Sequence, residues 1–196
     1  KLPVDTSPIT RRVTAVRRCS SWRWVSSGSD RRSGRSRRRT TVTAVIRTVT
    51  TAEELRGLLD VERAAGRSVG FVPTMGYLHD GHASLIRAAA AVTDVVVASV
   101  FVNPLQFAPT EDLAAYPRDL DGDLSVAAPA GCELVFVPSE DEMYPDGRDG
   151  VLSTVSVPAL AAVMEGASRP THFPGVCTVV AKLFNLVGPC SAFFGE

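Results

Sequence analysis

The sequence predicts an α/β fold, a Rossmann-like doubly wound parallel sheet with helices on both faces. Apolar runs of strand length alternate with runs of helix length, which implies strand–helix–strand crossovers. The run at 95–102 is almost wholly apolar, as expected for a strand buried on both faces of a parallel sheet. Polar turns follow the first two predicted strands, and ligands in such folds bind beyond the carboxyl ends of the strands.

The first predicted helix begins at a capping box, the segment Thr51-Ala52-Glu53-Glu54. The hydroxyl of Thr51 can accept the amide hydrogen of Glu54, and the Glu54 carboxylate can reach back to the first amide. Leucines spaced along one face continue the helical pattern to about residue 65, and Gly66 is suited to end it. The first strand is then predicted at 69–72.

The later elements follow from the same patterns of apolar period, proline and glycine. In chain order we predict a helix that opens at His79 and His82 and runs to about 92, a strand at 95–102, a helix at 119–128, a strand at 134–137, a more exposed strand at 151–157, a helix at 158–164, a helix at 176–186 and a strand at 192–194.

The chain divides near residue 45 into two parts of opposite charge. Residues 1–45 are rich in Arg and Ser and hold twelve Lys/Arg against two Asp/Glu, so they carry +10. Residues 46–196 hold nine Lys/Arg against nineteen Asp/Glu and carry −10. The first part shows no strand or helix period and has too little apolar surface to offset ordering entropy. We predict a disordered extension at 1–45 and one α/β domain at 46–196.

Three interpretations of the extension are open: a nucleic-acid-binding arm, a transit peptide, or a cloning or gene-calling extension without a role. The last is favoured because Trp22 and Trp24 fit no recognisable packing pattern. The chain starts at Lys1 rather than Met and stops just after an apolar run, so both ends are expected to be cut.

The composition argues against a membrane or disulfide-stabilised protein. No uninterrupted apolar run approaches the length that spans a bilayer. The four cysteines, at 19, 132, 177 and 190, form no CxxC pair and no metal-ligand spacing with the three histidines, so no metal site is predicted. Free thiols in a reducing cytoplasm are expected.

The segment 73–82, Pro-Thr-Met-Gly-Tyr-Leu-His-Asp-Gly-His, joins the first strand to its helix. A helix N-terminus favours phosphate, and glycine lets a ligand approach the backbone. His79 and His82 can donate hydrogen bonds to phosphoryl oxygens as charge builds in a transition state. The pattern therefore indicates a nucleoside triphosphate site, against the alternative that both histidines are simply solvated.

The turn after the second strand carries two uncharged amides, Asn103 and Gln106. Each amide donates and accepts, which suits a hydroxyl or carboxylate ligand. Asn before Pro is also ordinary turn chemistry, so Asn103 is open between the two roles, whereas Gln106 is predicted to bind substrate.

A second polar cluster is Arg169-Pro170-Thr171-His172-Phe173. Arg169 offers a planar fork for carboxylate or phosphate, and His172 precedes the helix predicted at 176–186. The alternatives are a surface salt bridge and a loop side chain. The aspartates at 119, 121 and 123 could hold Mg²⁺ beside phosphates, but more often such a run is an exposed helix start.

Several of these motifs together resemble the pantoate–β-alanine ligase family. The resemblance covers roughly 46–196, and its motifs run in the family's order. They are the HIGH-type segment 73–82, Val100-Phe101-Val102-Asn103-Pro104-Leu105-Gln106-Phe107, Tyr116-Pro117-Arg118, Met143-Tyr144-Pro145, Arg169-Pro170-Thr171-His172-Phe173 and Phe194-Gly195-Glu196.

The resemblance implies the HUP, or nucleotidyltransferase, type of the predicted fold and a two-step reaction. The carboxylate of pantoate attacks the α-phosphorus of Mg-ATP, and the amine of β-alanine then displaces AMP to form pantothenate. His79 and His82 would be catalytic. ATP binding would involve Met75, Gly76, His79, Gly81, His82, Gly195 and Glu196, and substrate binding would involve Gln106, Asn103, Arg169 and His172. Family members are usually homodimers.

The chain also departs from the family pattern. In the family a Lys-Asp pair follows Phe-Gly-Glu, and a Ser-Ser-Arg-type loop and a C-terminal domain come later, so these would lie beyond Glu196. Because such cations neutralise the leaving pyrophosphate, we expect a truncated chain with little or no activity. Two alternatives are another HIGH-type nucleotidyltransferase, and a non-catalytic module whose basic arm binds nucleic acid. The acidic main part argues against a broad nucleic-acid surface.

Overall fold

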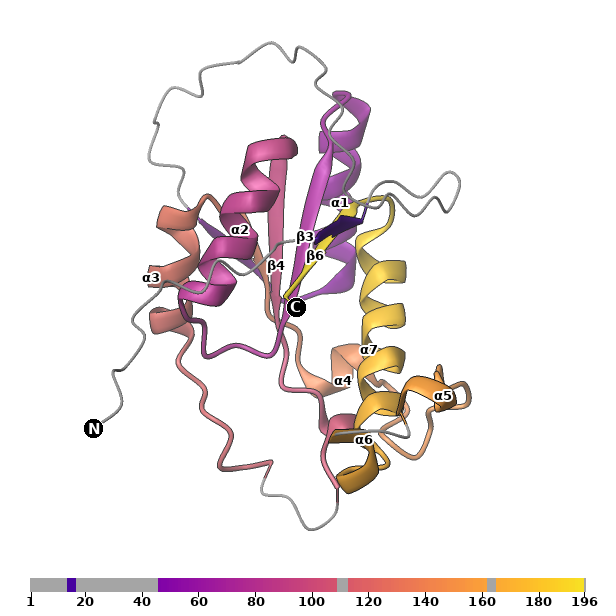
Figure 1. Cartoon of the computed structure of the whole chain (residues 1–196). Helices are drawn as coiled ribbons and strands as arrows, with labels where there is room; N and C mark the ends of the chain where they lie inside the picture. The colour runs from indigo at the N-terminus through magenta and orange to yellow at the C-terminus, as the bar shows by residue number, and fades with distance from the viewer. Residues whose placement is uncertain (1–13, 17–45, 109–112, 162–164, 196) are drawn as a thin grey trace, which may run out of the picture.

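The structure, a computed structural model, describes residues 14–16, 46–108, 113–161 and 165–195. A six-stranded sheet in the order β1-β6-β3-β4-β5-β2 forms its centre (Figure 1). Neighbours from β6 to β2 pair in parallel, and β1 pairs antiparallel with β6. The strands are β1 Thr14–Val16, β2 Arg47–Val49, β3 Val69–Thr74, β4 Val95–Val100, β5 Leu134–Phe136 and β6 Ser191–Phe194.

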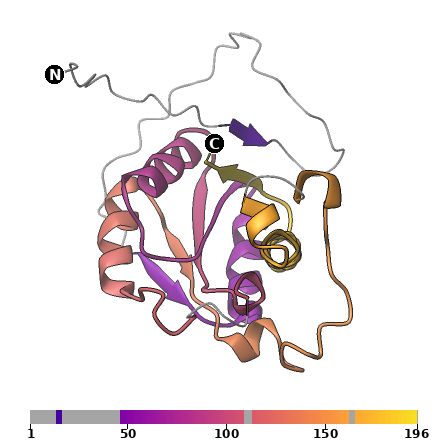
Figure 2. The ribbon, with the colours of Figure 1, turned by 60° about the horizontal axis from the view of Figure 1, so that its bottom comes forward.

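Helices cover both faces of the sheet, which confirms the doubly wound prediction. Figure 2 shows α2 and α3 on one side of the sheet and α1 and α7 on the other. The helices are α1 Ala52–Ala64, α2 Asp80–Val92, α3 Leu120–Ala130, α4 Glu140–Met143, α5 Pro158–Ala161, α6 Glu165–Ser168 and α7 His172–Val187, with a 3-10 turn, η1, at Pro104–Gln106. Among the described residues, no helix is long and apolar enough to cross a bilayer.

The sheet separates two apolar cores. Along β4, Val95 and Val97 join the core under α1 and α7, whereas Val96 and Ala98 join the core under α2 and α3. Successive strand side chains point to opposite faces, so a strand with a core on each face is apolar at nearly every position. The polar exception on β4, Ser99, accepts the amide hydrogen of Thr74. This geometry explains why the continuous run at 95–102 predicted a central strand.

The first helix begins and ends as predicted, but its capping box is only half formed. The Thr51 hydroxyl accepts the amide hydrogen of Glu54 at 3.3 Å, and Gly66 after the helix has φ +74°. The Glu54 carboxylate does not complete the box, because it accepts a hydrogen bond at 2.6 Å from Arg47 on β2. A charged partner on the neighbouring strand thus replaces the backbone amide.

The strand predicted at 151–157 is wrong. This segment forms no strand and lies outside the sheet, and Leu152 within it is 97% exposed. Its backbone instead bonds to a helix: the amide of Val155 donates to Thr178 Oγ1 on α7 at 3.0 Å. The helix α7 itself starts at His172, four residues before the predicted start, since Pro174 is tolerated in a first helical turn.

Several short elements have too few residues to show a period, and the sequence pattern did not predict them: β1, β2, α4, α6 and η1. Strand β1 falls inside the segment 1–45, for which disorder was predicted, so that expectation does not hold at Thr14–Val16. The rest of that segment, 1–13 and 17–45, lies outside the described residues, and the domain boundary near residue 45 stays a prediction.

Candidate functional site

Two polar turns lie side by side at the carboxyl edge of the sheet. Residues 75–82, the histidine turn, follow β3, and residues 103–107, the amide turn, follow β4. The two strands are parallel neighbours in register to their ends, where Thr74 is opposite Val100. The Nε2 of Gln106 donates to the sulfur of Met75 at 3.4 Å, so the turns are in direct contact.

The histidine turn is held from below by side chains of other elements. Thr74 Oγ1 donates to the carbonyl of Ser99 at 2.5 Å and accepts the amide hydrogen of Gly76 at 3.1 Å. Gly76 has φ +85°, and a Cβ there would lie 2.9 Å from both Val100 and the Asp123 carboxylate, so the turn needs glycine. The Asp123 carboxylate, which is buried, accepts the amide hydrogen of Leu78 at 2.6 Å.

His79 and His82 form one unit at the start of α2. Their ring centroids are 4.2 Å apart. The Nδ1 of His79 accepts the amide hydrogen of Gly81 at 3.0 Å, and the Nδ1 of His82 accepts the amide hydrogen of His79 at 3.3 Å. Since both Nδ1 atoms accept, the hydrogen of each neutral ring is assigned to Nε2. Each ring therefore offers one N–H donor to a ligand.

The protonation of His82 suits a donor that is neutral before a ligand binds. Burial lowers its pKa, the charge of His79 lowers it further, and Asp123 opposes both effects. His79 is exposed and His82 is partly buried at the positive end of the α2 dipole. An entering polyanion would meet two N–H donors and this helix N-terminus together.

The amide of Asn103 is fully buried, and all its atoms have protein partners. Its Nδ2 donates to Gln106 Oε1 at 3.0 Å and to the carbonyl of Gly175 at 3.1 Å. Its Oδ1 accepts from the amide of Leu105 at 3.3 Å and from the hydroxyl of Tyr144 at 2.8 Å. These four bonds occupy the whole amide of Asn103. Gln106 uses its Oε1 in one of them, and its Nε2 faces the histidine turn.

Arg169 and His172 converge on one backbone atom of the amide turn. Arg169 Nη2 donates to the carbonyl of Gln106 at 3.2 Å, and His172 Nδ1 lies 3.1 Å from the same oxygen. The structure thus brings both residues to the predicted substrate side. His172 is the first residue of α7, whereas the sequence placed it ahead of the helix.

The remaining predicted nucleotide ligands lie after β6. This strand is a parallel neighbour of β3, so Gly195 leaves the sheet at the same edge as the histidine turn, and it is exposed. Glu196 lies outside the described residues.

Sequence reasoning did not predict the roles of two residues that hold the site, Asp123 and Tyr144. An exposed helix start, the favoured interpretation of the aspartate run, fits Asp119, whose carboxylate caps α3 by accepting from the amide of Gly122 at 2.9 Å. Asp123 instead points inward to the histidine turn. Tyr144 appeared only inside a motif of the resemblance, and its hydroxyl binds Asn103. The available signal for Asp123 was its position one helical turn after Asp119, the residue that caps α3.

These features define a class of protein: a Rossmann-like α/β domain of the nucleotidyltransferase type, with a phosphate-suited turn and an amide turn at one edge of a parallel sheet. The chain belongs to the pantoate–β-alanine ligase family, whose family model matches residues 47–196. The structural neighbours share this fold.

Known proteins of high similarity cover the same part of the chain. A pantothenate synthetase of Sinorhizobium medicae (strain WSM419) is 55% identical over 151 residues, which are 77% of this chain and 51% of the relative. That of Pseudomonas putida (strain GB-1) is 56% identical over 149 residues, 76% of this chain and 52% of the relative. The chain therefore spans about half the length of the curated relatives it matches.

Two solved structures extend the comparison. The crystal structure of pantothenate synthetase from Thermus thermophilus aligns with a TM-score of 0.66 at 53% identity, over 74% of this chain and 50% of that one. A pantoate–β-alanine ligase from Francisella tularensis, complexed with β,γ-ATP and β-alanine, aligns with a TM-score of 0.64 at 37% identity, over 73% of this chain and 54% of that one.

Proposed function

We propose that this chain forms the nucleotide-binding part of an ATP-dependent ligase that condenses pantoate with β-alanine to pantothenate and releases AMP and pyrophosphate. The observation that carries the proposal is the contact of two unlike turns at one sheet edge, through Gln106 and Met75. One turn suits phosphate, and the other suits a hydroxyl or carboxylate. Membership of the ligase family supports the choice of substrates.

The nucleotide end is assigned to the histidine turn. His79 and His82 would donate from Nε2 to phosphate oxygens and stabilise the charge that develops on them. Met75, Gly76 and Gly81 would form the backbone against which the nucleotide lies. Gly195 and Glu196 would contact it from the end of β6, on the same edge of the sheet.

The acceptor end is assigned to the amide turn and the start of α7. Gln106 would donate from Nε2 to an oxygen of pantoate, since its Oε1 is directed to Asn103. Arg169 and His172 would line the β-alanine side. Although Asn103 was a candidate ligand, its four internal bonds favour a role in holding Gln106 over direct contact with substrate.

The chemistry proceeds in two balanced displacements. A carboxylate oxygen of pantoate forms a bond to the α-phosphorus of ATP while the bond from that phosphorus to pyrophosphate breaks. The amine of β-alanine then attacks the acyl carbon, loses a proton and displaces AMP. Holding both reactants at adjacent turns lowers the entropic part of both barriers, and donors aimed at the phosphates stabilise the first transition state.

Mg²⁺ would enter with ATP as part of the substrate. Among the described residues there is no group of three or more His, Cys, Asp or Glu placed to hold a metal ion. Asp123, the carboxylate beside the histidine turn, already accepts a backbone hydrogen bond. The phosphates and water would therefore supply most of the ligands, as is usual for Mg²⁺ bound to nucleotide.

A homodimer and a cytoplasmic location complete the proposal. The apolar side chains of Leu152, Val155 and Val157 are exposed on the segment outside the sheet, which supports burial against a second subunit. Among the described residues, Cys132 and Cys177 form no disulfide, and burial raises the pKa of Cys132 to about 12. Thiols outside disulfides fit a reducing compartment.

The proposal is tested first by nucleotide binding to this chain. Titration with the Mg²⁺ complex of a non-hydrolysable ATP analogue should give saturable binding, and His79→Ala with His82→Ala should weaken it at least tenfold, since two charge-assisted hydrogen bonds are lost. The control Arg87→Ala removes a cation from the exposed part of α2 and should change affinity little. Equal weakening in the control would point to general charge attraction and contradict the assignment.

Product analysis separates the ligase from a plain nucleotidyltransferase. With the chain in excess over ATP, even slow turnover gives measurable product. AMP formation should require pantoate, amide formation should require β-alanine, and ¹⁸O in the pantoate carboxylate should appear in AMP. Transfer of AMP to a phosphorylated acceptor without any amide product would support the other class instead.

A further inference from the structure

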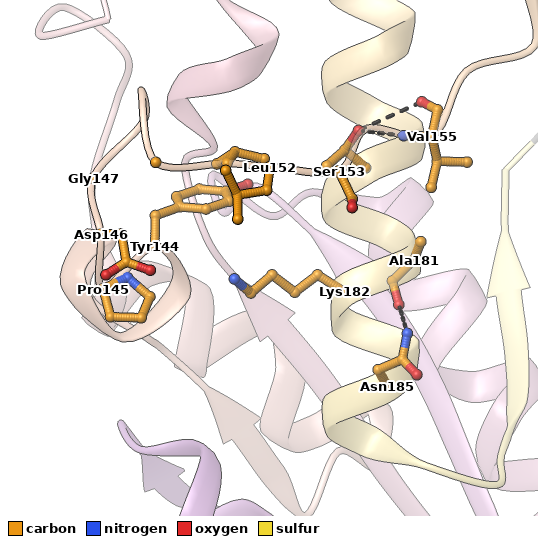
Figure 3. A pocket seen from close by; sticks show the side chains of 13 residues that line it. Tyr144, Pro145, Asp146, Gly147, Leu152, Ser153, Val155, Ala181, Lys182 and Asn185 are labelled. Carbon is orange, nitrogen blue, oxygen red and sulfur yellow. Dashed lines mark hydrogen bonds between the residues drawn. The ribbon is translucent and has the colours of Figure 1, made fainter.

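Tyr144 contacts the amide turn from the protein interior, and its hydroxyl is directed to Asn103. The residue follows α4 and is 2% exposed, within the core beneath α7. Its ring lies 6.1 Å from that of Phe101, and the Nζ of Lys182 lies 4.9 Å over the ring. Figure 3 shows Lys182 reaching toward Tyr144 from α7, across an open hollow of about 420 Å³. These neighbours hold the ring in place.

The hydrogen bonds around Asn103 leave only one orientation of its amide. The amide N–H of Leu105 can only donate, so the atom 3.3 Å from it must be Oδ1. The carbonyl of Gly175 can only accept, so the atom 3.1 Å from it must be Nδ2. Tyr144 supplies the second donor to Oδ1, at 2.8 Å.

The orientation of Asn103 determines that of Gln106. The second hydrogen on Asn103 Nδ2 goes to Gln106 Oε1 at 3.0 Å, so the NH₂ group of Gln106 must face the opposite way. That way lies the histidine turn, where Gln106 Nε2 meets Met75. If the Gln106 amide were reversed, its NH₂ group would face the NH₂ group of Asn103. Its Oε1, an acceptor, would then face the histidine turn.

We propose that Tyr144 is a positioning residue whose hydroxyl, through Asn103, keeps the NH₂ group of Gln106 directed into the site. Without the Tyr144 hydroxyl, Oδ1 of Asn103 would accept only the amide hydrogen of Leu105. Its second lone pair would then be buried without a donor, which is costly in an interior of low dielectric constant. The part of this proposal that concerns substrate affinity rests on the proposed function; the part that concerns amide orientation does not.

The hydroxyl stays a donor across the working range of pH. Burial of Tyr144, with a smaller contribution from the negative charge of Glu140, raises its pKa to about 12. Asn103 and Gln106 do not titrate. The relay from Tyr144 to Gln106 is therefore independent of pH near neutrality, unlike the histidine turn.

The decisive experiment compares Tyr144→Phe with two matched controls in the chain as it stands. Phenylalanine keeps the ring and removes only the hydroxyl. Lys182→Met removes the cation over the same ring, and Met143→Ala truncates a fully buried neighbour of Tyr144 and lowers stability without touching the hydrogen bonds. Side-chain NH₂ resonances of Asn103 and Gln106 are followed by NMR, assigned by loss in Asn103→Asp and Gln106→Glu.

In the unchanged chain, the two NH₂ groups should give shifted, slowly exchanging signals. Tyr144→Phe should accelerate hydrogen exchange of both groups at least tenfold and move their shifts toward those of free amides, while both controls leave them in place. Unchanged signals in Tyr144→Phe, or equal changes in Met143→Ala, would overturn the proposal, because the hydroxyl would then have no specific role. Both results can be read without any substrate.

Pantoate binding gives a separate second measurement. If the chain binds pantoate, Tyr144→Phe should weaken that binding roughly five- to tenfold, the usual effect of one misplaced hydrogen bond, and leave affinity for the ATP analogue unchanged. Equal loss for both ligands would contradict a specific role in positioning Gln106. If the unchanged chain binds no pantoate, the proposed function fails, while the NMR result still decides the relay.

Discussion

The histidine turn and the amide turn occupy equivalent places after adjacent strands, yet they are built in opposite ways. The histidine turn is open: His79 is exposed, and His82 is partly buried with a lowered pKa. The amide turn is closed: Asn103 and Gln106 are both buried. The histidine turn keeps its side-chain donors available to a ligand. The amide turn uses most of its side-chain donors in hydrogen bonds within the protein.

The difference follows from the kind of group each turn would bind. A polyphosphate carries its charge into the site, so a turn with exposed N–H donors and a helix N-terminus suffices. An uncharged hydroxyl or a single carboxylate must be distinguished by a few hydrogen bonds in the correct direction, which requires fixed amides. Each turn is also held from another element, by Asp123 on α3 in one case and by Tyr144 after α4 in the other.

The largest effect is expected at Gly175, where α7 touches the amide turn. A Cβ there would overlap the backbone carbonyl of Leu105, and backbone cannot move aside cheaply. We expect Gly175→Ala to lower the free energy of unfolding by roughly 3 kcal/mol, measured by urea denaturation. It should also disturb the bond from Asn103 to the Gly175 carbonyl.

A matched control is Gly57→Ala, also within a helix, where a Cβ would meet nothing within 4 Å. Here the usual preference of helices for alanine should raise stability by about 0.5–1 kcal/mol. Opposite signs at the two glycines would confirm the close approach of α7. Stabilisation at both would mean that α7 is not held against the amide turn.

The second prediction concerns Asp123, which has the corresponding role under the histidine turn. Asp123→Ala removes the acceptor of the Leu78 amide and should lower stability by about 2 kcal/mol, since a partly buried donor is left unmatched. Hydrogen exchange at Leu78 should accelerate, and affinity for the ATP analogue should fall. The exposed Asp121 of the same helix turn is the control, and Asp121→Ala should leave Leu78 exchange unchanged.

The sequence predicted much of the fold because the central strands are long and apolar on both faces. Runs such as 69–72 and 95–102 have one structural interpretation in a chain that alternates with helices. The failed strand at 151–157 is also rich in valine, but the hydrogen bonds of Val155 go to Thr178 on α7 and not to a neighbouring strand. Strand pairing is a property of the whole fold, and a local pattern does not contain it.

The site shows the same division between local and distant interactions. The pairing of His79 with His82 could be predicted because the two residues lie three apart in one turn, but its support by Asp123, 45 residues from Leu78, could not. The partners of the amide turn could not, since Tyr144 and Gly175 lie 41 and 72 residues from Asn103. Their role depends on where α4 and α7 are placed, which the sequence pattern near Asn103 does not record.

The third prediction tests whether the open turn still requires a fixed histidine. A Cβ at Gly81 would lie 2.8 Å from Cε1 and 3.0 Å from Nδ1 of His79, so Gly81→Ala should turn the His79 ring. Stability should stay nearly constant, because alanine favours a helix, while affinity for the ATP analogue falls roughly fivefold, the effect of one weakened hydrogen bond. Gly57→Ala should leave affinity unchanged. Undiminished affinity in Gly81→Ala would show that His79 does not need this orientation.

The smallest effect expected is a pH dependence that belongs to the histidine turn alone. Burial lowers the pKa of His82 below its ordinary value of 6.5, so the unfolded chain binds a proton first as pH falls. Stability should therefore decline once pH drops below about 6.5, and the decline should level off below the folded-state pKa. His82→Gln should remove this component, whereas Tyr144→Phe should retain it.

Nucleotide should reverse that shift, because phosphate beside the ring favours the imidazolium form that burial disfavours. In an NMR titration the pKa of His82 should rise on adding the ATP analogue, and by linkage affinity for the analogue should increase as pH falls through the bound-state pKa. If the pKa of His82 stays the same when the nucleotide is added, the His82 ring does not contact the phosphates. The histidine turn would then differ from the amide turn only in how exposed it is. The hydrogen-bond donors to the phosphates would instead be backbone amides of α2.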